Sequence, residues 1–370
     1  MCSFRPTSLI NPPLRTGADG HHAYAAGPRT PGRERRRRHA HRRNRLRRSG
    51  RRDRLLLWVV GVGAVLDALA RADPSRLLVV GVVATVWLTA WGLSLRTVLG
   101  VLGQDIGVLR AVAVYSSAVF ANNVTPFGQA GGEPFSAYLI SSETEVEYET
   151  GFAAISSVDA LHFVPSLTLG VLGLAYLGTS VTLGRQLTLV AGVVAALAVG
   201  IPLLGYYVYR NRERVEHAVG RVLTPVVRRV GSVVPGVEPL TEAEIESRIE
   251  AFFLDIDRVA TDRRGLALAL GYSALGWLAL AASLWCSLWA LGYAIPVAVA
   301  IVAIPVGDLA AAMPLPGGLG GLEALLVLVL VTLTSVSAPV AMAAALVHRV
   351  ATYFLPMVLG GGVAAVIATD

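Results

Sequence analysis

The sequence predicts an all-α polytopic membrane protein with about 6–8 transmembrane helices, because several apolar runs reach the roughly 20 residues that cross a bilayer. Of the 370 residues, 54% are hydrophobic and only 15% are charged, whereas soluble domains carry about 25% charged residues. Mean hydropathy is +0.60. This composition excludes a disordered chain and disfavours a soluble enzyme.

Residues 1–54 differ in composition from the rest of the chain. They contain 16 arginines against three acids, and the whole chain has no lysine. We expect a disordered cytoplasmic tail, because arginines hold a flanking segment on the cytoplasmic side and are attracted to anionic headgroups. Nucleic acid is not expected as a partner, since the basic block lacks aromatic residues that stack on bases. The other interpretation is that Met1 is a wrongly assigned start and that the true start codon lies downstream of it.

Apolar runs predict the membrane segments in order along the chain. The predicted segments are residues 55–71, 77–95, 106–122, 150–177, 187–209, 266–292, 297–313, 320–336 and 339–368. Residues 128–140 are too short to cross a bilayer alone, and residues 210–265 form a long polar insert. We therefore expect a membrane domain over residues 55–368.

The arginines of the insert 210–265 constrain the topology. It carries 10 arginines, and the positive-inside rule favours placing it in the cytoplasm with the N-terminus. That placement requires residues 106–122 to enter the membrane and 131–140 to return to the same side. These segments would form a re-entrant helix pair with its tip at Asn122–Gly132.

A second break at Pro314–Gly321 repeats this pattern between residues 297–313 and 320–336. This pair would enter from the opposite face, so the two re-entrant pairs would form an inverted repeat. Such Gly/Pro-interrupted pairs indicate the substrate site of a transporter. We expect a multi-pass protein of the cell (plasma) membrane with a cytoplasmic N-terminus.

The insert contains a predicted amphipathic helix. Thr241 and Glu244 have the spacing of a capping box, and apolar residues recur at helical spacing from Ile245 to Val259. We expect this helix to lie on the membrane or against the helical bundle.

The two breaks and the charges near them supply the candidate site. Glycine permits positive φ and close approach, proline frees carbonyl groups, and a charge inside a bilayer costs about 2.5–3.5 kcal/mol, which makes it a candidate functional group. The candidate substrate-binding residues are Asn123, Thr125, Gln129, Glu133, Asp159, Asp308, Glu323, Arg349 and Tyr353. The residues that shape the breaks are Pro126, Gly131, Gly132, Pro134, Pro314, Pro316, Gly317, Gly318 and Gly320.

These groups also have structural interpretations. Glu133 and Glu323 could each cap the helix that follows, and Arg349 requires one of them as a partner. Asp159 and His162 lie three residues apart on one helical face, where they could form a local hydrogen bond, and a structural polar contact is expected for them. We expect no catalytic residue, metal site or cofactor, because the spacings of known metal and nucleotide motifs are absent from the sequence.

The motifs, taken in order, resemble the lysylphosphatidylglycerol synthase transmembrane family of flippase-like membrane proteins. The resemblance covers residues 55–368 and is carried by these motif residues: Asn123, Thr125-Pro126, Gly131-Gly132-Glu133-Pro134, Tyr138-Leu139, Pro314, Pro316-Gly317-Gly318-Leu319-Gly320, Glu323, Arg349, Tyr353 and Pro356. It implies movement of a polar-headed phospho- or glycolipid between leaflets, with membrane lipids as partners. Some relatives add a soluble aminoacyl transferase domain, which is not expected here because the chain ends at Asp370.

A different class of function stays open. The chain could be a non-catalytic membrane partner that presents a lipid-linked substrate to a separate lipid-modifying transferase through residues 210–265. A membrane-embedded transferase is disfavoured, because the sequence has no nucleotide or metal motif.

Overall fold

The computed structural model describes residues 62–125, 129–180, 185–212, 214–215, 217–221, 225, 241–312 and 315–367. All regular elements in these residues are helices, which confirms the predicted all-α class. The helices are α2 (Val62–Ala70), α3 (Pro74–Val101), α4 (Val108–Val124), α5 (Gln129–Thr144), α6 (Tyr148–Ser180), α7 (Arg185–Arg210), α9 (Glu242–Thr261), α10 (Arg263–Ala290), α11 (Val297–Asp308), η1 (Leu309–Ala312), η2 (Pro316–Gly318), α12 (Gly321–Leu333), α13 (Ala338–Arg349), η3 (Val350–Phe354) and α14 (Leu355–Ile367). The predicted tail, Pro126 and Pro314 lie outside the described residues.

Five helical segments of the described chain are long and apolar enough to cross a membrane. They are Pro74–Val101, Tyr148–Thr179, Arg263–Ala290, Pro316–Leu333 and Ala338–Ala365. The helices α4 and α11 are apolar but shorter. The predicted multi-pass membrane protein is therefore confirmed. Residues 297–313, predicted as one segment, divide into α11 and the 3₁₀ turn η1.

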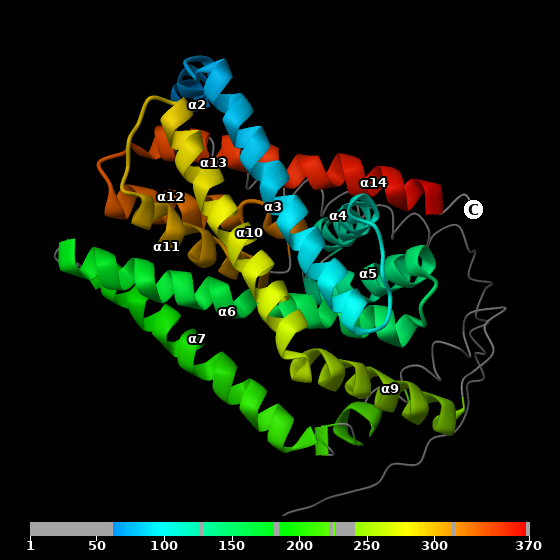
Figure 1. Cartoon of the computed structure of the whole chain (residues 1–370). Helices are drawn as coiled ribbons and strands as arrows, with labels where there is room; N and C mark the ends of the chain where they lie inside the picture. Colours follow the sequence, from blue (N-terminus) through cyan, green and yellow to red (C-terminus); the bar gives the residue numbers. More distant parts are fainter. Residues whose placement is uncertain are drawn as a thin grey trace, which may run out of the picture. The chain divides into compact units, whose positions relative to one another are not determined.

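Helices α3 and α10 form a long antiparallel pair (Figure 1). The Nε1 atom of Trp91 donates to the carbonyl of Ser273 at 3.2 Å, and the Ser94 hydroxyl donates to the carbonyl of Ala269 at 3.2 Å. Gly276 lets the helices meet, because a Cβ atom there would lie 2.0 Å from Nε1 of Trp91. Small residues at such crossings permit close packing between membrane helices.

Helices α4 and α5 form a helical hairpin. Arg110, near the start of α4, pairs with Glu143, near the end of α5, through Nε and Oε2 at 3.7 Å. At the other end the backbones nearly touch, since a Cβ atom on Gly132 would lie 2.7 Å from the Cα atom of Asn122. Helices α4 and α5 therefore run antiparallel, and the hairpin opens at the end that holds Arg110 and Glu143.

Helices α11 and α12 form the second hairpin, which opens toward the other end of the α3–α10 pair. The Trp285 Nε1 atom in the last turns of α10 donates to the carbonyl of Ile295 at 2.9 Å, just before α11. The first hairpin is joined to the last turns of α3, where Arg96 Nε donates to the carbonyl of Ile106 at 2.6 Å. Because α3 and α10 are antiparallel, the open ends of the hairpins lie at opposite ends of this pair.

Helix α6 packs against both hairpins. A Cβ atom on Gly151 would lie 2.8 Å from the carbonyl oxygen of Ala137 in α5, and one on Gly173 would lie 2.7 Å from the Val302 side chain in α11. A side chain at either glycine would push the helices apart. These two contacts place the middle of α6, which contains Asp159, between the hairpins.

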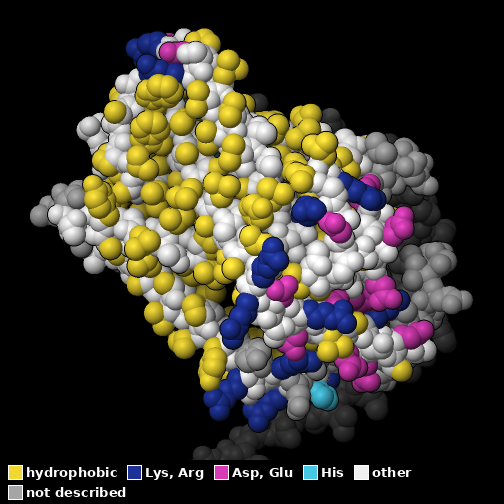
Figure 2. Space-filling view, viewed as in Figure 1, with side chains coloured by type: hydrophobic (Ala, Val, Ile, Leu, Met, Phe, Trp, Pro, Cys, Tyr) yellow, Lys and Arg dark blue, Asp and Glu magenta, His cyan; other side chains and the backbone are white. Residues whose placement is uncertain are grey.

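The surface agrees with a membrane-embedded bundle. Figure 2 shows hydrophobic side chains gathered over α3 and α10, with few charges between them. Arginines and acids gather at the end near α9, and a smaller group of charges lies at the end near α2. An apolar band with few charges between two charged ends is the pattern expected for a protein surrounded by lipid.

Helix α9 is the predicted amphipathic helix, and its capping box is confirmed. The backbone nitrogen of Thr241 donates to Oε2 of Glu244 at 2.7 Å, and its hydroxyl accepts from the Glu244 backbone nitrogen at 3.3 Å. The helix packs on α6, where Thr150 donates to the buried Asp255 carboxylate at 2.7 Å. Of the two predicted locations, the structure shows α9 against the bundle.

The capping box predicts a local dependence on pH. Hydrogen bonds from the backbone and the hydroxyl of Thr241 hold the pKa of Glu244 below its ordinary value of 4.5. Because the folded-state pKa is the lower one, the stabilisation is present above the ordinary pKa and is lost as pH falls through the folded-state value. We expect hydrogen-exchange protection factors in the first turn of α9 to fall with acid. Glu244→Gln should remove this dependence, whereas Glu246→Gln should leave it; equal profiles for both variants would contradict the assignment.

Candidate functional site

The tips of the two hairpins meet. A Cβ atom on Gly317 in η2 would lie 3.0 Å from Oδ1 of Asn123, near the end of α4, and 2.5 Å from Cε2 of Tyr353 in η3. Both side chains therefore converge on one backbone position of the second break. We call the group Asn123, Gly317, Arg349 and Tyr353 the tip junction.

The second break depends on its glycines. Gly317, Gly318 and Gly320 have φ values of 57°, 63° and 83°. These values lie in the left-handed region, which side chains with a Cβ atom rarely adopt. The break leads directly into α12, where the Gly320 backbone nitrogen donates to Oε2 of Glu323 at 2.7 Å. Glu323 therefore caps α12, as its structural interpretation expects.

Arg349 joins the second break to α13. Its Nε atom donates to Oε1 of Glu323 at 3.0 Å, and its Nη2 atom donates to the carbonyl of Gly317 at 2.7 Å. The guanidinium carbon lies 4.6 Å from the centre of the Tyr353 ring, within the range of a cation–π contact. Of the two partners expected for Arg349, the structure shows Glu323.

The arginine lies at the point where α13 changes its helical geometry. Residues Val350–Phe354 form a π-helical turn, and Pro356 follows in α14. Proline has no backbone N–H for the carbonyl of Thr352, so the regular helix is interrupted here. Single π turns inside helices occur frequently at functional sites.

Three carboxylates from three helices are grouped around Asp159, and one of them, Asp308, is within electrostatic range of Arg349 in the tip junction. Asp159 of α6 is buried, and it is within electrostatic range of Glu133 in α5 and of Asp308 in α11. The Ser156 hydroxyl donates to Oε2 of Glu133 at 3.5 Å. Asp308 lies at the protein surface, within electrostatic range of Arg349. We call Glu133, Asp159 and Asp308 the carboxylate cluster.

Asp159 and His162 lie side by side on α6 without a hydrogen bond between them. Asp159 Oδ1 and His162 Nδ1 are 4.0 Å apart, beyond hydrogen-bond distance. The His162 ring instead stacks on Trp91 of α3, with ring centres 4.0 Å apart. Within the described residues, Asp159 Oδ2 and both ring nitrogens of His162 are buried without a hydrogen-bond partner.

The other predicted residues have local roles in the first hairpin. The Thr125 hydroxyl donates to the carbonyl of Ala121 at 2.8 Å, at the end of α4. Gln129 is the first residue of α5, which also contains Gly131 and Pro134. The carbonyl of Pro134 accepts from the Tyr148 hydroxyl at 3.2 Å. In the second break, Pro316 is the first residue of η2.

Ser156 and Asn122 are not among the predicted site residues. Asn122 Oδ1 is buried without a partner among the described residues, and Ser156 contacts Glu133 across 23 positions of sequence. The Asn122-Asn123 pair in an apolar run is a sequence signal for Asn122, whereas no local pattern identifies Ser156. In the described part of the chain, no group of three or more His, Cys, Asp or Glu side chains could hold a metal ion.

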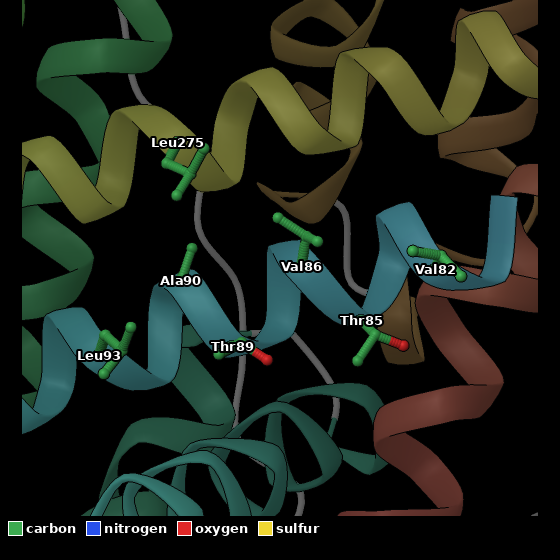
Figure 3. Close-up of a pocket in the computed structure, with 7 residues that line it drawn as sticks. All are labelled: Val82, Thr85, Val86, Thr89, Ala90, Leu93 and Leu275. Atoms are coloured by element: carbon green, nitrogen blue, oxygen red, sulfur yellow. The ribbon is translucent and has the colours of Figure 1, made fainter. Parts of the chain in front are cut away.

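A separate groove lies on the outer face of the α3–α10 pair (Figure 3). Its volume is about 320 Å³, and all of its lining residues except Leu275 come from α3. The lining residues are Val82, Thr85, Val86, Thr89, Ala90, Leu93 and Leu275. Its walls are mainly apolar and include none of the predicted site residues, so this surface suits contact with hydrocarbon, not with a headgroup.

The comparisons with known proteins agree with the membrane architecture. The chain is 26% identical over 314 residues to a UPF0104 membrane protein of Methanothermobacter thermautotrophicus, covering 83% of this chain and 87% of the relative. A UPF0104 membrane protein of Pyrococcus horikoshii is 22% identical over 314 residues, covering 83% and 91% of the two chains. The family model described as "Lysylphosphatidylglycerol synthase TM region" matches residues 54–360. This chain therefore belongs to the family of the lysylphosphatidylglycerol synthase transmembrane region.

Proposed function

We propose that the protein moves a polar-headed phospho- or glycolipid between the leaflets of the cell membrane. The observation that carries the proposal is the tip junction, where two broken hairpins that open toward opposite ends of the α3–α10 pair come together. Irregular backbone at membrane depth is stable only when it is buried in protein or borders a hydrated cavity. Such breaks are typical of transporter substrate sites.

Membrane insertion of the hairpins follows from this proposal. The first hairpin enters from the side of α9, which we place in the cytoplasm with the N-terminal tail because of the arginines of the insert. The second hairpin enters from the opposite side of the membrane, outside the cytoplasm. Their tips then lie near the midplane, where a headgroup can be held while the acyl chains stay in lipid.

The polar groups at the tips supply the headgroup contacts in this proposal. Arg349 binds a phosphate oxygen, since a guanidinium recognises phosphate through charge-assisted hydrogen bonds. Asn123 beside Gly317, with Thr125 and Gln129 of the first break, offers hydrogen bonds to hydroxyl groups. Glu133 accepts hydrogen bonds from hydroxyl or ammonium groups.

A charge-neutral double variant tests the role of Arg349. Glu323→Gln/Arg349→Gln removes the guanidinium without leaving an unpaired buried carboxylate. Loss of a charge-assisted contact worth about 1.5–3 kcal/mol should slow translocation roughly 10- to 160-fold. The rate is measured in proteoliposomes with a fluorescent phospholipid and a membrane-impermeant quencher.

The matched control is the ion pair between α9 and α6. Arg248 Nη1 lies 2.8 Å from Oε1 of Glu149, and Glu149→Gln/Arg248→Gln should translocate lipid at the rate of the unmodified protein. Equal rates for the two double variants would refute phosphate binding by Arg349. If the unmodified protein moves no lipid but binds a lipid-modifying transferase through residues 210–265, translocation is refuted. The protein then presents a lipid-linked substrate to that transferase.

A further inference from the structure

Asp159 is set apart from the other carboxylates by its burial. It is 6% exposed, so a lipid headgroup cannot contact it without opening the bundle. Glu133 is half-buried and Asp308 is exposed, so protein atoms do not fully enclose these two members of the carboxylate cluster. The cluster thus leads from groups at the protein surface to a group enclosed by protein.

The surroundings of Asp159 provide no compensating positive charge in the described chain. The charged groups within its electrostatic range are Glu133 and Asp308. Arg349 acts on Asp308, but its guanidinium is already paired with Glu323. Three carboxylates in a medium of low dielectric repel one another strongly, so the cluster is stable only if it binds a cation.

His162 is the second observation that points to a ligand. It is 4% exposed, it lies on the same face of α6 as Asp159, and neither ring nitrogen has a hydrogen-bond partner among the described residues. Its ring stacks on the Trp91 ring, and the ring centre of Tyr115 in α4 lies 6.4 Å from that of His162. An unpartnered carboxylate oxygen beside an unpartnered imidazole can hold an exchangeable proton.

A metal ion does not fit this arrangement as well as a proton does. Metal ions need several ligands at about 2–2.6 Å, and the described residues contain no group of three or more His, Cys, Asp or Glu side chains placed to hold one. A proton requires only one carboxylate oxygen. Chains of Asp, Glu and His inside membranes serve as proton relays in pumps and transporters.

We propose that Asp159 binds and releases a proton, with His162 beside it and with Glu133 and Asp308 as the groups through which the proton exchanges with water. One O–H bond forms when the carboxylate takes a proton from water, and the same bond breaks when the proton returns to water. Coupling of this proton to lipid movement rests on the proposed function, whereas proton binding itself does not.

Infrared spectroscopy of the purified protein in lipid tests proton binding directly. The carbonyl band of a protonated carboxylic acid, which shifts in heavy water, should be present at neutral pH. Asp159→Asn should remove it. The matched control is Asp255→Asn, because Asp255 is equally buried but is bonded to Thr150 and Arg258; the band should persist there. Asp159→Glu keeps an acid at the position and should restore a band at a changed frequency.

A band that survives Asp159→Asn unchanged, or no band in the unmodified protein, would overturn the proton site. Coupling is tested in proteoliposomes with a pH difference across the membrane. One proton per lipid gives about a tenfold unequal distribution of lipid per pH unit, and Asp159→Asn should abolish this response. Translocation that ignores the pH difference would overturn the coupling. If no lipid moves at all, the proposed function fails while the infrared result still decides the proton site.

Discussion

Replacing Gly360 with valine is expected to force α14 away from α4 and to destabilise the protein by about 3 kcal/mol, the upper part of the usual range for overpacking. A Cβ atom on Gly360 would lie 2.0 Å from the carbonyl oxygen of Ser116 and 2.4 Å from its carbonyl carbon. These are backbone atoms, so no change of side-chain rotamer can relieve the clash. The midpoint of thermal unfolding of the purified protein measures the effect.

The same helix provides the control for this substitution. Gly362 lies two residues further along α14, and a Cβ atom there would have no atom within 4 Å. Gly362→Val should therefore leave the unfolding midpoint nearly unchanged. Since α4 ends beside Asn123 of the tip junction, Gly360→Val should also slow translocation. Equal midpoints for the two variants would show that α14 does not pack on α4 as described.

The long helices could be predicted from sequence because a membrane helix must satisfy its own backbone hydrogen bonds. Apolar length alone then locates it: the predicted segments 77–95 and 266–292 correspond to α3 (Pro74–Val101) and α10 (Arg263–Ala290). The two Gly/Pro breaks could also be located, since both glycine and proline disfavour the interior of a helix. The hairpins agree with these expectations, and their insertion as re-entrant pairs stays a prediction.

Contacts within the site were less predictable. Glu133 and Glu323 both follow a glycine-rich break, so the sequence gives no basis for choosing between them as the partner of Arg349. The spacing of Asp159 and His162 predicts a polar contact on one helix, but it gives no sign that the His162 ring stacks on Trp91 of another helix. Sequence spacing describes neighbours on one helix, whereas these partners are decided by how separate helices pack.

Arg349→Gln alone is expected to be more damaging than Arg349→Gln combined with Glu323→Gln. The two side chains are 12% and 9% exposed, so loss of the guanidinium leaves a buried carboxylate without a counter-charge. Breaking a buried pair in this way typically costs about 3–5 kcal/mol, whereas replacing both partners is often nearly neutral. The midpoints of Arg349→Gln, Glu323→Gln and the double variant, converted to changes in the free energy of unfolding relative to the unmodified protein, give the coupling energy between the two residues.

The exposed pair of Arg96 and Asp105 is the reference for this comparison. The Asp105 side chain is 87% exposed, and exposed ion pairs are worth about 0–1 kcal/mol, so Arg96→Gln and Arg96→Gln/Asp105→Asn should unfold at nearly the same midpoint. If the double variant Glu323→Gln/Arg349→Gln unfolds at the same low midpoint as Arg349→Gln, the unpaired Glu323 carboxylate is not the cause of the lost stability. The loss would then come from the hydrogen bond to the Gly317 carbonyl, and Arg349 would stabilise the break itself before it stabilises the charge of Glu323.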